Sequence, residues 1–189
     1  FLSDADVALY LKIGYERFRA LVNSTNEMQY ALELDATPNS RTYSIGVQFD
    51  ALISVCRLHG SDLLGIEELY PVTRSEELYI TERGPQVTRY YLRGRTLRFS
   101  REVTDQIRIT YIPRSIVDFS QPADGIDNLE PYHDVIALLG YSNYAIRDGE
   151  INQPLEMLSQ QRVSELRSYL QEGRSKEQSS TIADVPDWL

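Results

Sequence analysis

Residues 87–112 read VTRYYLRGRTLRFSREVTDQIRITYI, and this stretch decides the fold. Alternate positions in its three runs are apolar, and arginines stand between them. The apolar set is Tyr90, Leu92, Leu97, Phe99, Ile107, Ile109 and Tyr111, and the arginine set is Arg89, Arg93, Arg98 and Arg108. Period-two alternation is typical of antiparallel strands with one buried and one solvated face. The stretch therefore predicts an antiparallel meander, with a tight turn at Gly94 and a longer turn over 101–106.

The β pattern reaches back towards the N-terminus. TYSIGV (42–47) and LISVCRL (52–58) are short runs with β-branched residues, which favour strands. We therefore predict a β-rich region over 42–112, and MQYALELD (28–35) is a candidate short strand before it.

Helical patterns flank this region on both sides. Apolar or small residues at three- and four-residue spacing predict a helix over 3–23, begun by a capping box of Ser3 and Asp6. Two more helices are predicted after the β-rich region, over 131–147 and 154–172.

Local signals set the ends of these two helices. Pro131 suits a first helical position, where its missing N–H is not needed, and Gly173 is predicted to stop the last helix. Strands and helices are segregated along the chain, so we expect an α+β fold, in which one N-terminal and two C-terminal helices form a bundle with an antiparallel β-rich middle. Residues 1–173 are expected to form one domain, followed by an extended tail over 174–189.

Composition narrows the function classes. The chain has 189 residues and a net charge of −9, which disfavours a general coat for nucleic acid. No apolar run approaches the length of a membrane span, and the single cysteine, Cys56, cannot form an internal disulfide. The chain has 13 tyrosines, and its basic residues are nearly all arginine, a bias typical of contact-rich surfaces and also of some lineages.

The adjacent pair His133 and Asp134 is the most tempting catalytic candidate. It raises the alternative of a His-Asp metallohydrolase, but the chain has only one other histidine, His59. Adjacent helical residues also point about 100° apart. We therefore interpret the pair as the polar first turn of a helix and predict no enzyme activity, no metal site and no cofactor. A dyad of Cys56 and His59 is a weaker alternative.

Charged residues around the β-rich region are the main binding candidates. The arginines could form a face for an acidic partner, including another copy of the chain, or a sheet platform for nucleic acid, and a plain solvated face is the alternative. The candidate subunit-interface residues are Arg89, Arg93, Arg98, Arg108, Glu67, Glu68, Glu76 and Glu77.

The C-terminal tail is a second binding candidate. IADVPDWL (182–189) places four apolar residues after a polar linker: Ile182, Val185, Trp188 and Leu189. Trp is a frequent anchor residue in interfaces, so we predict a docking peptide for another subunit. Packing of the tail on its own core is the alternative.

Four stretches together resemble the head-to-tail adaptor proteins of tailed bacteriophages. They cover nearly the whole chain, and the order and spacing of the stretches carry the resemblance. The stretches are SDADVALYLKIGYERFRALV (3–22), TYSIGVQFDALISVCRLHGSDLLGIEEL (42–69), RGPQVTRYYLRGRTLRFSREVTDQIRITYIPR (83–114) and LEPYHDVIALLGYSNYAIRDGEINQPLEMLSQQRVSEL (129–166).

The resemblance implies a structural virion protein. Such a protein would form a dodecameric ring in the neck between capsid and tail, docked on the portal, after assembly in the bacterial cytoplasm. Its partners would be further copies of itself, the portal protein and tail or nozzle proteins, with no membrane. The ring would extend the DNA channel without binding DNA specifically, which suits an acidic chain. The resemblance further implies that the tail orders on the portal and that the 131–147 helix serves packing.

Overall fold

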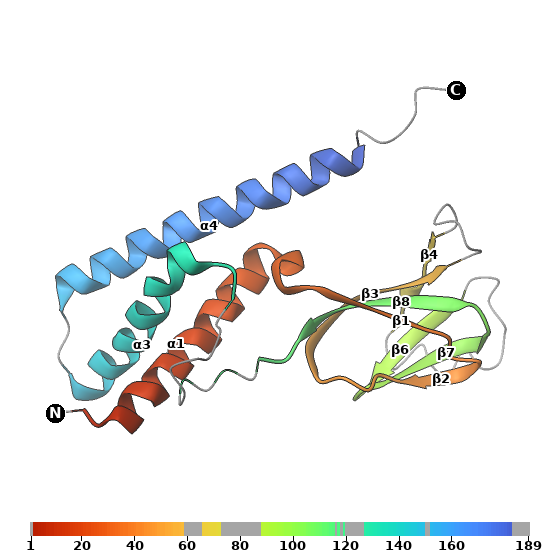
Figure 1. The fold of residues 1–189 in the computed structure, drawn as a ribbon, viewed down its shortest axis with the longest axis horizontal. Coiled ribbons are helices and arrows are strands. Elements are labelled where there is room, and N and C mark those ends of the chain that lie inside the picture. The colour runs from red at the N-terminus through yellow and green to blue at the C-terminus, as the bar shows by residue number, and fades with distance from the viewer. Residues whose placement is uncertain are drawn as a thin grey trace. The chain divides into compact units, whose positions relative to one another are not determined.

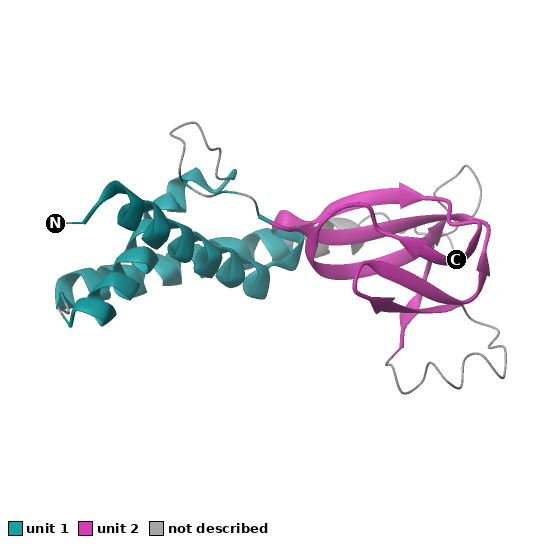
Figure 2. Ribbon diagram, turned by 90° about the horizontal axis from the view of Figure 1, so that it is seen from below, with its two compact units in different colours: residues 1–29, 115–189 teal, residues 30–114 magenta. Residues whose placement is uncertain are grey.

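The computed structural model describes residues 2–58, 66–72, 88–115, 117, 119, 127–149 and 152–182, with side chains as far as 175. Helices and antiparallel-rich sheets confirm the α+β class (Figure 1). The chain forms two compact units. The helical unit comprises Phe1–Gln29 and Ser115–Leu189, and the β unit comprises Tyr30–Arg114 (Figure 2).

Among the described residues, the helical unit contains three α-helices. These are α1 (Asp4–Thr25), α3 (His133–Asp148) and α4 (Gln153–Ile182), with the short helices η1 (Glu27–Tyr30) after α1 and η2 (Glu130–Tyr132) before α3. The predicted capping box is confirmed, because the Asp6 amide donates to Ser3 Oγ while Asp6 Oδ2 accepts from the Ser3 amide. Gly149 ends α3 with a left-handed backbone, φ 73°.

Two glycines let α1 and α3 cross with their backbones in contact. A Cβ built on Gly14 would lie 2.2 Å from the Ile136 carbonyl oxygen, and one on Gly140 would lie 2.7 Å from the Tyr10 carbonyl oxygen. Around this crossing the Tyr10 and Tyr144 rings meet edge to face, with centroids 5.6 Å apart. Gly140 therefore admits α1 as a close neighbour of α3.

The last helix differs from its prediction. α4 continues through Gly173 to Ile182, so the prediction that Gly173 stops it is wrong. Gly173 is not among the residues with positive φ, and the surrounding Arg, Glu, Lys and Gln residues favour helix. An interior glycine costs a helix about 1 kcal/mol, which good helix formers on both sides offset. The first part of the expected tail, up to Ile182, is thus helical backbone.

The described part of the β unit forms two four-stranded sheets. Its strands are β1 (Leu32–Ala36), β2 (Ser40–Ser44), β3 (Phe49–Leu58), β4 (Ile66–Glu68), β5 (Tyr70–Pro71), β6 (Arg89–Arg93), β7 (Thr96–Val103) and β8 (Gln106–Pro113). The strand order is β1-β8-β3-β4 in one sheet, here the β8 sheet, and β2-β7-β6-β5 in the other, the β7 sheet. All pairs are antiparallel except β5 with β6.

The predicted meander is only half right. β6 and β7 form the expected hairpin around Gly94, whose φ is 61°. β8, however, does not pair with β7, because Thr104 and Asp105 carry the chain into the other sheet, and the longer turn predicted over 101–106 is absent. A single meander would leave its apolar face bare, whereas two facing sheets bury both apolar faces in one core.

Both sheets contribute to that core. Val55, Ile107 and Ile109 of the β8 sheet and Leu97 and Phe99 of the β7 sheet belong to one buried cluster. The positions between them point outward, as the alternation predicts. The arginines of the pattern therefore lie on the outer surfaces of the two sheets.

Candidate functional site

His133 and Asp134 do not form a joint site. His133 Nε2 lies 2.7 Å from Asp127 Oδ1, whereas both Asp134 oxygens accept hydrogen bonds from Arg162 of α4. The two side chains thus engage different partners, as expected for adjacent helical residues. In the part of the chain that the structure describes, no group of three or more His, Cys, Asp or Glu side chains could hold a metal ion. His59 lies outside that part.

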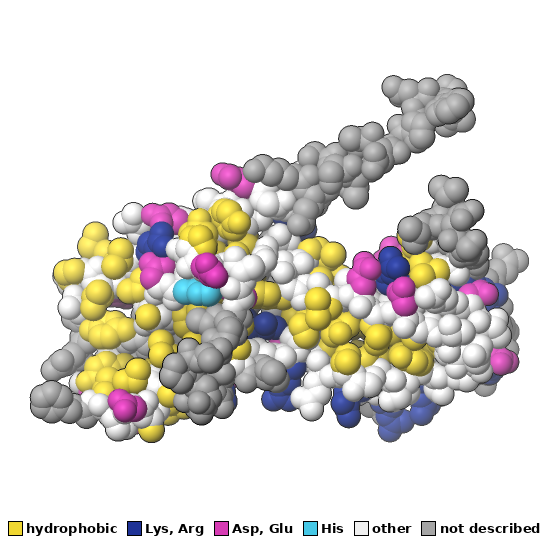
Figure 3. Space-filling model, viewed as in Figure 1, with side chains coloured by type: hydrophobic (Ala, Val, Ile, Leu, Met, Phe, Trp, Pro, Cys, Tyr) yellow, Lys and Arg dark blue, Asp and Glu magenta, His cyan; other side chains and the backbone are white. Residues whose placement is uncertain are grey.

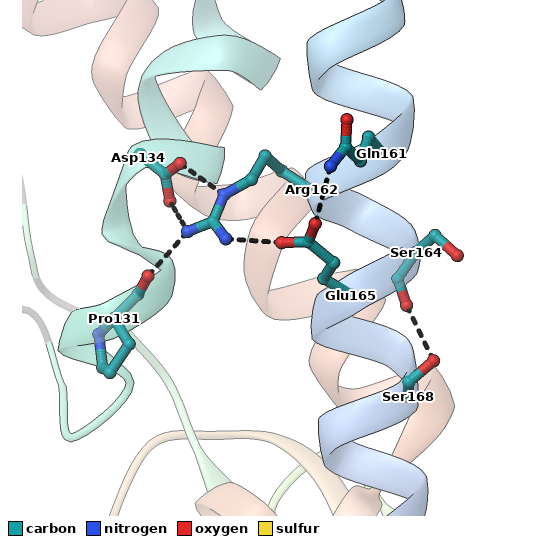
Figure 4. A network of polar contacts seen from close by, with 7 residues as sticks. All are labelled: Pro131, Asp134, Gln161, Arg162, Ser164, Glu165 and Ser168. Carbon is teal, nitrogen blue, oxygen red and sulfur yellow. Dashed lines mark hydrogen bonds and ion pairs between the residues drawn. The ribbon is translucent and has the colours of Figure 1, made fainter.

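Arg162 joins the start of α3 to α4 (Figure 4). Its Nε donates to Asp134 Oδ2 over 2.6 Å and its Nη1 donates to Glu165 Oε2 over 2.6 Å. Its Nη2 donates to Asp134 Oδ1 and to the Pro131 carbonyl oxygen. Such a two-fold fork is the geometry in which arginine binds carboxylate best. The conspicuous Asp134 is therefore half of an interhelical ion pair.

These bonds change the acidity of both carboxyl groups. The hydrogen bond from Arg162 lowers the pKa of Asp134 below its ordinary value. The pKa of Glu165 is lowered too, first by a hydrogen bond from Gln161 and then by Arg162. Both groups are therefore held ionised, which suits a structural contact and not a general acid.

Three of the four predicted interface arginines share one surface. Arg89 and Arg93 of β6 and Arg98 of β7 are exposed on the outer side of the β7 sheet, which we call the arginine face. Arg98 stands over the ring of Tyr91, its cross-strand neighbour, at 5.9 Å from the ring centroid. None of the described carboxylates lies within ion-pair distance of these three guanidinium groups.

The strands of the β7 sheet are basic as a group. They carry five arginines and one acid: Arg41, Arg89, Arg93, Arg98, Arg101 and Glu102. Figure 3 shows dark blue side chains along the lower edge of the β unit. In a chain whose net charge is −9, this is a local reversal of the overall sign.

The fourth predicted arginine belongs elsewhere. Arg108 lies on the β8 sheet and binds Asp35 of the neighbouring strand through Nε at 2.9 Å and Nη2 at 3.1 Å. Glu33 lies 3.3 Å from the same Nε. The hydrogen bond from Arg108 lowers the pKa of Asp35, so this carboxylate stays ionised. The prediction that Arg108 joins the other three arginines is therefore wrong.

The outer side of the β8 sheet carries a row of residues across all four strands. Asp35, Arg108, Cys56 and Glu68 lie directly opposite one another on β1, β8, β3 and β4. With Glu33 beside Asp35, they form what we call the carboxylate face. Burial and the neighbouring Glu68 raise the pKa of the Cys56 thiol, which disfavours a reactive thiolate. This face is net acidic because only Arg108 opposes its three carboxylates.

Arg57 was not predicted as a functional or structural residue. It shares the inward side of β3 with Val55, and its Nη1 lies 3.0 Å from Glu67 Oε2 and its Nε lies 3.4 Å from Asp105 Oδ2. The fully buried Thr88 hydroxyl accepts hydrogen bonds from Arg57 and from Arg101. Glu67 therefore pairs within its own chain, which argues against its predicted part in a subunit interface.

The structure does not describe the side chains of the remaining predicted interface and tail residues. Glu76, Glu77, Val185, Trp188 and Leu189 lie outside the described residues, and Ile182 is described only as the last residue of α4. None of the described helices has the length and apolar character that a membrane span requires.

Comparison with known proteins adds no family to this picture. The chain matches no protein-family model, and a search of curated proteins finds no match to it.

Proposed function

We propose that this protein is a head-to-tail adaptor that forms a ring on the portal of a tailed bacteriophage and extends the DNA channel toward the tail. The observation that carries the proposal is the element order. In the sequence, the β unit is inserted between the first helix and the last two, and within the helical unit α1 packs against α3. This order agrees with what the resemblance implies.

The charges of the β unit support the same function. A ring needs two different surfaces on each copy, because one surface of each subunit meets another surface of the next. The arginine face and the carboxylate face are two such surfaces within one unit. The net charge of −9 suits a conduit, since a basic lining would hold DNA through counterion release.

The tail is the proposed portal anchor, and a single substitution tests it. Trp188→Ala should reduce co-sedimentation with portal rings about tenfold or more, because buried Trp anchors are often worth 2 kcal/mol or more. The melting temperature should not change. Met157→Ala, which truncates an exposed residue of α4, is the control and should bind portal as the natural chain does. Equal co-sedimentation of the Trp188 variant would remove the tail from the proposal.

Nucleic-acid binding is the second candidate, favoured by Arg89, Arg93 and Arg98 on one face with Tyr91 among them. It predicts DNA binding that weakens steeply with salt and is lost in Arg93→Gln/Arg98→Gln. A titration of labelled DNA at two salt concentrations separates the two functions, because the adaptor is expected to show no such binding at physiological salt.

A further inference from the structure

The two outer faces of the β unit carry opposite charge. The arginine face presents Arg89, Arg93 and Arg98, and no described carboxylate pairs with them. On the carboxylate face, Arg108 is engaged by Asp35 and Glu33, and Glu68 stands at the opposite edge strand. The positive charges of the arginine face therefore complement the negative charges of the carboxylate face.

We propose that the β unit forms the subunit contact of the ring, with the arginine face of one copy on the carboxylate face of the next. This inference rests on the proposed adaptor function and names the surfaces through which its copies meet. Because the two faces belong to different sheets, the contact is head-to-tail and can be repeated from copy to copy until the ring closes.

A second copy of the chain could bind both charged faces, whereas each of the other partner classes could bind only one of them. A nucleic acid would use the arginines and would be repelled by Glu33, Asp35 and Glu68. A basic partner would use those carboxylates and leave the arginines without a role. Only a chain that carries both charge patterns satisfies both surfaces, and the chain itself is such a partner.

The spacing of the charges is compatible on the two faces. Glu68 lies three strands away from Asp35 in the β8 sheet, a span of about 14 Å at the usual distance between strands. Arg89 and Arg93 are four residues apart on β6, a span of about 13 Å. Two ion pairs can therefore form at once if the strands of the two copies cross at a steep angle.

The centre of the arginine face suits a contact, and the carboxylate face contains a residue that can report one. Arg98 stands over the Tyr91 ring at the centre of the arginine face, and Tyr and Arg are, with Trp, enriched among the residues that anchor interfaces. Cys56 lies within the charged row between Arg108 and Glu68. It is the only cysteine of the chain, so it reports whether the carboxylate face is covered.

A charge-swap experiment tests the contact. An acidic variant, Arg89→Glu/Arg93→Glu, has two negative faces, and a basic variant, Glu33→Lys/Glu68→Lys, has two positive faces. Each alone should need at least about tenfold more protein than the natural chain to form the multi-copy complex on portal, because like charges then face each other. An equimolar mixture should recover assembly, since the two variants can alternate around the ring.

The outcomes separate the contact from the function. Sedimentation gives the mass, and circular dichroism verifies that each variant is folded. Arg17→Glu/Arg174→Glu changes the same number of exposed charges in the helical unit and should assemble normally. Folded variants that assemble alone, or a mixture that does not recover, would overturn the proposed contact while the natural ring still supports the adaptor function. A natural chain that never forms a multi-copy complex, alone or on portal, would overturn both.

The reactivity of Cys56 provides an independent test on the unmodified protein. Thiol labelling with a maleimide should slow at least about fivefold when the natural chain assembles, because a covered thiol is no longer accessible to the reagent. An unchanged labelling rate in the assembled ring would place the carboxylate face outside the contact.

Discussion

The helical unit and the β unit use their polar groups differently. In the helical unit, Arg162 is satisfied by Asp134, Glu165 and the Pro131 carbonyl, and Arg147 donates to the Tyr10 hydroxyl. The β unit instead keeps Arg89, Arg93 and Arg98 exposed on one face. Arg147 and Arg162 thus contribute to the internal order of the helical unit, whereas the arginine face of the β unit carries three guanidinium groups that pair with none of the described carboxylates.

The largest expected change in the free energy of unfolding concerns the crossing of α1 and α3 in the helical unit. Gly14→Ala should destabilise the protein by about 2–3 kcal/mol, because the new methyl group meets the Ile136 carbonyl at 2.2 Å and the helices must move apart. Thermal unfolding followed by circular dichroism measures it. The matched control is Gly173→Ala in α4, where an added Cβ would have no tertiary neighbour within 4 Å, and it should stabilise by about 0.5–1 kcal/mol. Equal melting temperatures for the two variants would show that the crossing is not tight.

The next effect concerns the buried polar group of the β unit. Thr88→Val keeps the shape of the side chain but removes the oxygen that accepts from Arg57 and Arg101, and should cost about 1–3 kcal/mol. Thr88→Ser keeps that oxygen and should lose less. Urea denaturation of the pair separates the hydroxyl from the methyl group, and an equal loss in both would assign the effect to packing.

A smaller effect depends on pH. Because the pKa of Asp134 is lowered in the folded protein, its contribution is complete above the unfolded value near 4 and disappears as the pH falls through the folded value. Asp134→Asn should therefore destabilise at pH 7, by less than about 1 kcal/mol because solvent screens the pair, and the difference from the natural chain should shrink as the pH falls below the unfolded value. Melting temperatures measured from pH 7 downwards follow this difference. A deficit that stays constant as the pH falls would mean that the ion pair is not its cause.

The smallest expected effect on stability is at the arginine face. Arg98→Gln should change the free energy of unfolding by no more than about 0.5 kcal/mol, since this side chain is exposed and stands over the Tyr91 ring on the sheet surface. Chemical denaturation provides the measurement. A loss above 1 kcal/mol would mean that the arginine face stabilises the fold and is not reserved for a partner.

Local features of the fold could be predicted from the sequence, and non-local ones could not. The Ser3–Asp6 capping box, the Gly94 turn and the outward arginines depend on a few neighbouring residues, and all three are confirmed. The separation of β7 from β8 depends on strand pairing across the whole β unit. Gly173 shows that a local signal can also mislead. A glycine often stops a helix, but here helix-forming residues on both sides keep α4 helical through it.

The candidate surfaces show the same limit. Arg98 and Arg108 occupy equivalent positions in the alternation, yet of the two only Arg108 pairs with a carboxylate among the residues that the structure describes, and that carboxylate belongs to Asp35, 73 positions away. A local sequence pattern cannot reveal a contact between residues that lie so far apart in the chain. Arg57 did leave a signal: it stands two residues after Val55, on the inward side of the same strand, where a charged side chain requires partners.

The central claim is that many copies of this chain assemble on a portal, and the mass of the complex tests it most directly. Native mass spectrometry or sedimentation of the purified chain, alone and mixed with portal rings, counts the copies. The adaptor function predicts a ring of twelve copies, formed alone or only on the portal. A chain that stays a monomer or dimer and ignores the portal would contradict it.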